Sequence, residues 1–84
     1  MEIIYQNSFL RQLKKLPKDL KEEALEKIDL FKEDPINKQL KTHKLKGKFA
    51  GLYSFSVNYS YRIIFEIIED NYHFLEFGDH DIYK

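Results

Sequence analysis

The hydrophobic pattern of this chain changes its period between the two halves, and the change limits the folds that the chain can adopt. Before residue 35 the apolar side chains recur every three to four residues, which is the period of an amphipathic helix. After residue 51 they alternate with polar side chains or stand together as aromatic and β-branched residues, which is typical of strands. Helices from the first half must therefore cover a sheet from the second half, as in an α+β domain.

The first half of the chain predicts a short strand followed by two helices. The strand covers Glu2–Tyr5, and Asn7 or Ser8 is placed to cap the first helix. Pro17 separates the two helices, because a proline ends the first and fits the first turn of the second. Asp34-Pro35 ends the second helix. The apolar faces of the two helices consist of Phe9, Leu13 and Leu16, and of Leu20, Ala24, Ile28 and Phe31.

Three strands follow in the second half, and their short spacing predicts an antiparallel meander. Arg62 begins the middle strand, which is otherwise largely apolar, and shares a face with Ile64. The polar stretch 36–51 predicts a functional loop or a short edge strand. Residues 1–84 thus form a single domain of order β-α-α-β-β-β, with two N-terminal helices packed on a small, mostly antiparallel sheet. The three predicted strands are Leu52–Val57, Tyr61–Ile68 and Tyr72–Phe77.

The composition of the chain excludes several classes of protein. The chain has no cysteine, which excludes disulfide frameworks, thiol nucleophiles and cysteine-ligated zinc. No apolar run reaches the length of a membrane span, and the N-terminus lacks the pattern of a signal peptide. We therefore expect a cytoplasmic protein that has no membrane partner.

Basic side chains are concentrated in the middle of the chain. Residues 37–62 hold six basic and no acidic side chains, although the whole chain balances 14 Lys and Arg against 14 Asp and Glu. Such a segment can bind phosphate groups, or it can be a solvated lysine-rich loop, and the sequence leaves both interpretations open. This basic segment consists of Lys38, Lys41, Lys44, Lys46, Lys48 and Arg62.

Two histidines are candidates for acid–base chemistry. His43 stands among the lysines of the basic segment, where positive neighbours favour the neutral imidazole that a general base requires. His80 stands between Asp79 and Asp81, which favour the protonated imidazole of a general acid. The alternatives are an idle surface histidine at position 43 and a flexible tail around position 80.

These side chains fit RNA cleavage without a metal ion if the fold brings them together. One imidazole would take the proton from a 2′-hydroxyl, the other would protonate the departing 5′-oxygen, and Arg62 would stabilise the charge on the phosphate. No spacing typical of zinc or calcium ligands accompanies the histidines. We therefore expect a site that needs neither a metal nor a cofactor.

Five segments, taken in their order along the chain, resemble the RelE/ParE toxin superfamily, and most closely its RelE/StbE and YafQ-like branch. The resemblance implies a toxin of a type II toxin–antitoxin system, a ribosome-dependent endoribonuclease that cleaves mRNA in the A site by metal-independent general acid/base catalysis. It also implies a cognate antitoxin that wraps the toxin with an acidic, partly disordered segment, and contact with operator DNA only through that antitoxin. The five segments are Phe9–Pro17, His43–Gly47, Tyr53–Val57, Tyr61–Phe65 and Gly78–Tyr83.

The resemblance also assigns roles to individual residues. His43 is the expected general base and His80 the expected general acid. Lys46 and Arg62 are expected to contact and stabilise the phosphate, and Tyr83 to stack on a base of the substrate. The neighbouring lysines are expected to bind the substrate, namely Lys41, Lys44 and Lys48.

Two other functions fit the same superfamily. A ParE-like toxin would inhibit DNA gyrase, and an inactive toxin homologue would act with its antitoxin as a co-repressor, because a shared fold does not fix function. The chain also departs from the YafQ pattern at two positions: Ser60 stands where an acidic residue is frequent, and Ser56 replaces a second histidine. The paired His43 and His80 nevertheless favour the nuclease over the gyrase inhibitor.

Overall fold

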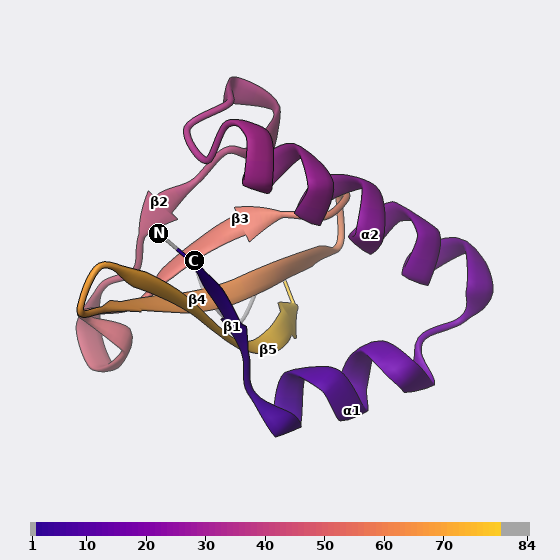
Figure 1. Cartoon of the computed structure of the whole chain (residues 1–84), viewed down its shortest axis with the longest axis horizontal. Coiled ribbons are helices and arrows are strands. Elements are labelled where there is room, and N and C mark those ends of the chain that lie inside the picture. The colour runs from indigo at the N-terminus through magenta and orange to yellow at the C-terminus, as the bar shows by residue number, and fades with distance from the viewer. Residues whose placement is uncertain (1, 80–84) are drawn as a thin grey trace.

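Two helices cover one face of a five-stranded sheet in the computed structural model, which describes residues 2–79 (Figure 1). The helices come first in the chain after a short strand, and the remaining strands follow, so the predicted α+β class is confirmed. The elements are β1 (Ile3–Tyr5), α1 (Asn7–Lys15), α2 (Lys18–Glu33), β2 (His43–Lys44), β3 (Tyr53–Ser56), β4 (Tyr61–Ile68) and β5 (Asn71–Asp79), with short 3₁₀ helices at Lys38–Leu40 and Gly47–Phe49.

The strands lie in the order β1-β5-β4-β3-β2. Strands β3, β4 and β5 form the predicted antiparallel meander, and β1 joins its outer edge parallel to β5. The polar stretch before β3 contains a two-residue edge strand, β2, which pairs antiparallel with β3 and sets His43 opposite Ser54. The sheet is therefore mostly antiparallel, as expected, with one parallel pair at an edge.

Local sequence signals set the ends of both helices. Helix α1 stops before Pro17, which serves as the N-cap of α2, and the carbonyl of Pro17 accepts a hydrogen bond from Lys21 N at 2.9 Å. Helix α2 ends at Glu33, and the N–H of its C-cap residue Asp34 donates to Leu30 O at 2.8 Å. The predicted cap of α1 is wrong: Gln6 occupies the N-cap position and makes no side-chain capping bond. The Ser8 hydroxyl instead donates to Leu75 O of β5.

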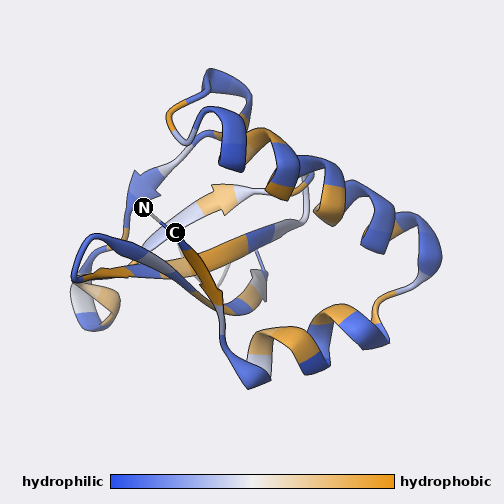
Figure 2. Cartoon of the chain, in the orientation of Figure 1, coloured by the Kyte–Doolittle hydropathy of each residue, from blue (hydrophilic) through white to orange (hydrophobic). Residues whose placement is uncertain are grey.

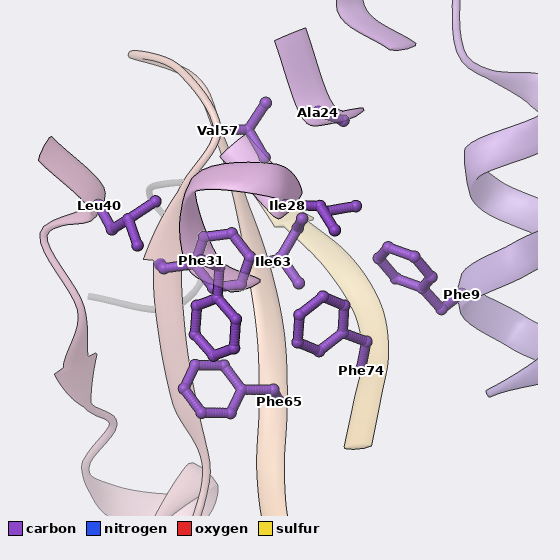
Figure 3. Packing of buried hydrophobic residues seen from close by; sticks show 10 residues of the cluster. Phe9, Ala24, Ile28, Phe31, Leu40, Val57, Ile63, Phe65 and Phe74 are labelled. Atoms are coloured by element: carbon purple, nitrogen blue, oxygen red, sulfur yellow. The ribbon is translucent and has the colours of Figure 1, made fainter. Parts of the chain in front are cut away.

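The main core lies between the helices and the sheet, where phenylalanines from both helices and from β3, β4 and β5 meet (Figure 3). Phe31 of α2 stacks on Phe55 of β3 with ring centroids 4.7 Å apart, and both side chains are buried. Hydrophobic and hydrophilic residues alternate along the two helices, as their amphipathic patterns predict (Figure 2). The buried core residues are Phe9, Ala24, Ile28, Phe31, Leu40, Phe55, Val57, Ile63, Phe65 and Phe74.

Strand β5 contains an irregularity that its sequence pattern did not predict. The register with β4 shifts between Ile64, which pairs with Glu76, and Phe65, which pairs with Phe74, so Leu75 is an extra residue on β5. Because of this bulge, Phe74 and Phe77 both contact the core although three positions separate them. Helix α1 covers the edge of β5 beyond the end of β1, since the Gln12 side chain accepts a hydrogen bond from Phe77 N at 2.7 Å.

A second, smaller cluster covers part of the opposite face of the sheet. Leu45 packs against Ile64 of β4, with Phe49 and Leu52 beside them. The loop that carries these residues closes through a hydrogen bond from Leu45 N to Leu52 O at 2.9 Å. Gly47 and Gly51 have φ angles of 66° and 94°, which residues with a Cβ rarely adopt. This cover buries Ile64, which shares its face of β4 with Arg62.

None of the helices within residues 2–79 is long and apolar enough to cross a membrane.

Candidate phosphate-binding and catalytic site

Within residues 2–79 one charged side chain is buried, that of Arg62, which has 3% of its surface exposed. On one side it pairs with Ser56 of β3, and on the other with Gly78 of β5, which brings no side chain against it. Burial lowers the pKa of Arg62 below its usual value, because loss of water penalises the charged form. The guanidinium nevertheless carries its positive charge at neutral pH, because the delocalised charge of an arginine is not lost by deprotonation in proteins.

Hydrogen bonds from neighbouring segments hold the Arg62 guanidinium in place. Its Nε donates to the Ser54 hydroxyl at 2.7 Å, and its Nη2 donates to the Lys41 carbonyl oxygen at 2.8 Å. A further, longer contact joins Nη2 to the carbonyl oxygen of Ser54 at 3.4 Å. Within residues 2–79 no carboxylate forms an ion pair with Arg62. The protein thus supplies neutral acceptors for a buried cation, an arrangement that suits the binding of an anion.

His43 reaches this guanidinium from the edge strand β2. Its side chain is exposed, and its Nδ1 lies 3.2 Å from Arg62 Nη2 and 3.1 Å from the Lys41 carbonyl oxygen. The two contacts exclude each other, because Nδ1 must carry a hydrogen to donate to Lys41 and must lack one to accept from Arg62. In the first case Nε2 of the neutral ring keeps a free lone pair, which is what a general base needs.

The backbone of Lys41 is the shared acceptor of this arrangement. Lys41 follows the 3₁₀ helix Lys38–Leu40 and adopts a left-handed conformation, with φ 49° and ψ 45°. Its carbonyl lies within hydrogen-bonding distance of both Arg62 and His43, while its side chain is exposed. Lys41 therefore enters the site through its main chain, a contribution that the sequence analysis did not foresee.

The remaining lysines of the loop are exposed around this centre. Lys44 lies on β2 beside His43, and Lys46 precedes the 3₁₀ helix Gly47–Phe49. The ammonium group of Lys48 lies 5.3 Å from the centroid of the ring of Phe49, which packs against the second cluster, and the two form a cation–π contact. No hydrogen bond joins Lys46 to Arg62 or His43 in the part of the chain that is described. Its predicted contact with phosphate therefore stays a prediction.

His80 and Tyr83 lie outside the described residues, so their expected roles stay predictions. Strand β5 ends at Asp79, opposite Tyr61, and the preceding Gly78 pairs with Arg62. Of the five residues that were expected to be catalytic, the structure brings His43 and Arg62 into direct contact.

Two partners of Arg62 were missed by the sequence analysis, namely Ser54 and the carbonyl of Lys41. A signal for Ser54 was present, because the apolar residues of β3 alternate with serines that must face away from the core. No comparable signal marks the Lys41 carbonyl, since its direction depends on a left-handed turn. No three side chains within residues 2–79 come together as metal ligands would.

The order of the elements and of the strands defines a RelE-like toxin fold. The chain belongs to the family described as the ParE toxin of type II toxin–antitoxin system, parDE, whose sequence model matches residues 3–82. The predicted membership of the RelE/ParE superfamily is therefore confirmed. A comparison with curated protein sequences gives no match.

Solved structures of several toxins are similar to this chain. YafQ from E. coli strain BL21(DE3) has a TM-score of 0.76 at 19% identity, over 96% of this chain and 94% of that chain. A YoeB/ParE toxin from Agrobacterium tumefaciens has a TM-score of 0.75 at 18% identity, over 95% and 99% of the respective chains. A chain of the archaeal RelE-RelB complex from Pyrococcus horikoshii OT3 has a TM-score of 0.71 at 20% identity, over 93% and 92%. At these identities the similarity establishes the fold.

Proposed function

We propose that this type II toxin is a ribosome-dependent endoribonuclease that cleaves mRNA in the ribosomal A site without a metal ion. One observation carries the proposal: a buried arginine, with no carboxylate partner within residues 2–79, contacts an exposed histidine at a surface rich in lysine. A cation for the phosphate and an imidazole for the proton are what cleavage by an adjacent 2′-hydroxyl requires.

The proposed reaction assigns each group a separate task. His43 Nε2 takes the proton from the 2′-hydroxyl, and the 2′-oxygen attacks the adjacent phosphorus. Arg62 stabilises the negative charge that accumulates on the phosphoryl oxygens. The bond from phosphorus to the 5′-oxygen then breaks, and His80 gives the leaving oxygen its proton. The products are a 2′,3′-cyclic phosphate and a 5′-hydroxyl end.

This assignment requires one of the two contacts that His43 Nδ1 can form. Nδ1 has to carry a hydrogen and donate it to the Lys41 carbonyl, because only then does the neutral ring leave Nε2 free to accept a proton. A phosphate that draws Arg62 Nη2 toward itself removes the competing donor from Nδ1. Substrate binding would therefore favour the tautomer that catalysis needs.

The exposed lysines are proposed to bind the RNA around this centre. Lys46 contacts the scissile phosphate, and the flanking side chains neutralise neighbouring phosphates, which is the usual basis of affinity for nucleic acid. Tyr83 stacks on a base of the substrate. The flanking side chains in this proposal are Lys41, Lys44 and Lys48.

The proposed protein partner is a cognate antitoxin, and the site is proposed to work in the cytoplasm on mRNA bound to the ribosome. The similar archaeal structure is a RelE-RelB complex, which supports an antitoxin partner for this chain. An acidic segment that folds on binding would complement the exposed lysines. Operator DNA would then be contacted through the antitoxin only.

A direct test uses purified protein and ribosomes that translate a defined mRNA. The proposal predicts cleavage within codons in the A site by the wild type and by the control variant His73→Gln. His73 contacts Gln6 at 3.3 Å and takes no part in the Arg62 cluster, so it controls for the loss of a histidine. Absence of cleavage by folded wild-type protein would contradict the proposal.

A second function has support from the family match. The family model describes ParE toxins. Inhibition of DNA gyrase, the function expected of a ParE-like toxin, is therefore the alternative to RNA cleavage. A supercoiling assay with purified gyrase separates the two functions. Inhibition of supercoiling without RNA cleavage would replace the nuclease by the gyrase inhibitor, whereas cleavage without inhibition would support the nuclease.

A further inference from the structure

Ser54 occupies a central place in the site, although it contributes no charge. It is fully buried on β3, between β2 and β4. Its pairing partners are His43 on one side and Ile64 on the other, so it is the cross-strand neighbour of the histidine. Its hydroxyl also accepts the 2.7 Å hydrogen bond from Arg62 Nε. Ser54 thus contacts the strands that carry both members of the candidate catalytic pair.

The bond to Nε limits how the guanidinium can be oriented. An arginine head is planar, and a hydrogen bond at Nε fixes the rotation of that plane about the end of the side chain. In this orientation Nη2 reaches the Lys41 carbonyl at 2.8 Å and His43 Nδ1 at 3.2 Å. Without the hydroxyl, the buried Nε–H would lose its acceptor, and the plane could turn to find another.

We propose that Ser54 is a positioning residue, which sets the plane of the Arg62 guanidinium and thereby directs Nη2 toward the phosphate that is bound beside His43. The proposal rests on the proposed function, because it requires Arg62 to act on a phosphate. It assigns Ser54 no contact with the substrate. Its effect therefore falls on the rate of the chemical step rather than on substrate binding.

The chain offers a matched control on the same strand. Ser56 is also a serine of β3, but its hydroxyl donates to the carbonyl oxygen of Asn58 at 2.9 Å. Ser54→Ala and Ser56→Ala therefore remove the same atom from one strand, and only the first removes the acceptor of Arg62 Nε. Ser54→Thr keeps the hydroxyl and tests for rescue.

The first measurement compares kcat and KM for cleavage of ribosome-bound mRNA. We expect Ser54→Ala to lower kcat by about 10- to 100-fold and to change KM by less than about threefold, because the defect is one of orientation. Ser56→Ala should stay within about threefold of the wild type, and Ser54→Thr should recover most of the lost rate. Wild-type kcat in Ser54→Ala, or equal losses in both alanine variants, would overturn the proposal.

A second measurement does not depend on activity. The solvent exchange of the Arg62 Nε–H, followed by nitrogen-15 NMR, reports directly on its hydrogen bond. We expect exchange to be at least about tenfold faster in Ser54→Ala than in the wild type and in Ser56→Ala. Unchanged exchange would overturn the positioning role, even if the wild type cleaves no RNA. Faster exchange in a protein without nuclease activity would support the role of Ser54 while refuting the proposed function.

Discussion

The Nη2 atom of Arg62 lies 3.2 Å from Nδ1 of His43, and the carbonyl oxygen of Lys41 lies within hydrogen-bonding distance of both atoms. The three groups come from β4, from β2 and from the turn before β2. Because the guanidinium is buried and the imidazole is exposed, the cluster joins the interior of the sheet to a surface that carries exposed lysines. Stability and activity should therefore respond differently to changes at each position.

Replacing Arg62 by methionine should remove activity and leave the fold stable. Methionine fills a similar volume without the desolvation cost of a charge, but it leaves the Ser54 hydroxyl and the Lys41 carbonyl without their donor. Because these two effects oppose each other, we expect Arg62→Met to lower the free energy of unfolding by no more than about 2 kcal/mol, measured by urea denaturation. Cleavage should fall at least about 100-fold, since the phosphate loses its cation.

Arg62→Lys is the informative companion variant. It keeps the charge, but it cannot reach the Ser54 hydroxyl and the Lys41 carbonyl with the same planar fork. We expect it to be less stable than Arg62→Met and nearly as inactive. A lysine variant with wild-type stability and activity would show that a positive charge alone suffices, against the geometric account.

Replacing His43 by alanine should affect catalysis far more than folding. The side chain is exposed, and substitutions at such positions change the free energy of unfolding by less than about 0.5 kcal/mol. Loss of a general base lowers rates by about 10²- to 10⁴-fold, so cleavage by His43→Ala should fall within that range. Thermal unfolding and single-turnover cleavage measure the two effects. A change of less than about threefold in rate would remove His43 from the mechanism.

Asn58 should contribute to stability through the turn that leads into β4. Its Oδ1 accepts hydrogen bonds from Ser60 N at 2.8 Å and Tyr61 N at 2.9 Å, and its Nδ2 donates to Glu23 at 3.2 Å. Asn58→Ala should lower the free energy of unfolding by about 1–2 kcal/mol, because two backbone donors lose their partner. Glu23→Gln, which alters only the bond to α2, should cost less than about 0.5 kcal/mol. Equal losses in both variants would contradict the role assigned to the turn.

Antitoxin binding should weaken as salt is added. The acidic segment proposed for the antitoxin would be attracted by the exposed lysines, and such an attraction is screened over about 8 Å at physiological ionic strength. The double variant Lys44→Glu and Lys48→Glu should bind more weakly and show a smaller salt dependence. The control is Lys18→Glu, which makes the same lysine-to-glutamate change at the start of α2, outside the basic segment. An affinity that does not change with salt would contradict the electrostatic explanation.

The sequence was sufficient to predict those elements of the fold whose local signals agree with the tertiary packing. Pro17 and Asp34-Pro35 end helices, and alternating residues predict the meander, because both patterns act over a few neighbouring positions. The bulge at Leu75 and the bond from Ser8 to Leu75 could not be predicted. They depend on how α1 lies against the edge of β5 once the chain has folded.

The sequence was sufficient to select two residues that meet in the candidate site, but not to predict the geometry around them. Arg62 and His43 were identified from their residue types and surroundings in the sequence, and the sheet register brings them together. The loop that carries Leu45 over Ile64, on the face of β4 that also holds Arg62, is a packing that no periodicity indicates. The Lys41 carbonyl enters the site through a left-handed backbone conformation, which a lysine does not signal.

The measurement that tests the central claim most directly is primer extension on a reporter mRNA after induction of the toxin in growing cells. The variants are His43→Ala, Arg62→Ala and His80→Ala, each checked for folding, beside the wild type. The account predicts growth arrest with cuts within codons for the wild type, and neither arrest nor cuts for the three variants. Growth arrest without mRNA cleavage, equally strong in all three variants, would contradict it and would move the target from the ribosome to DNA gyrase.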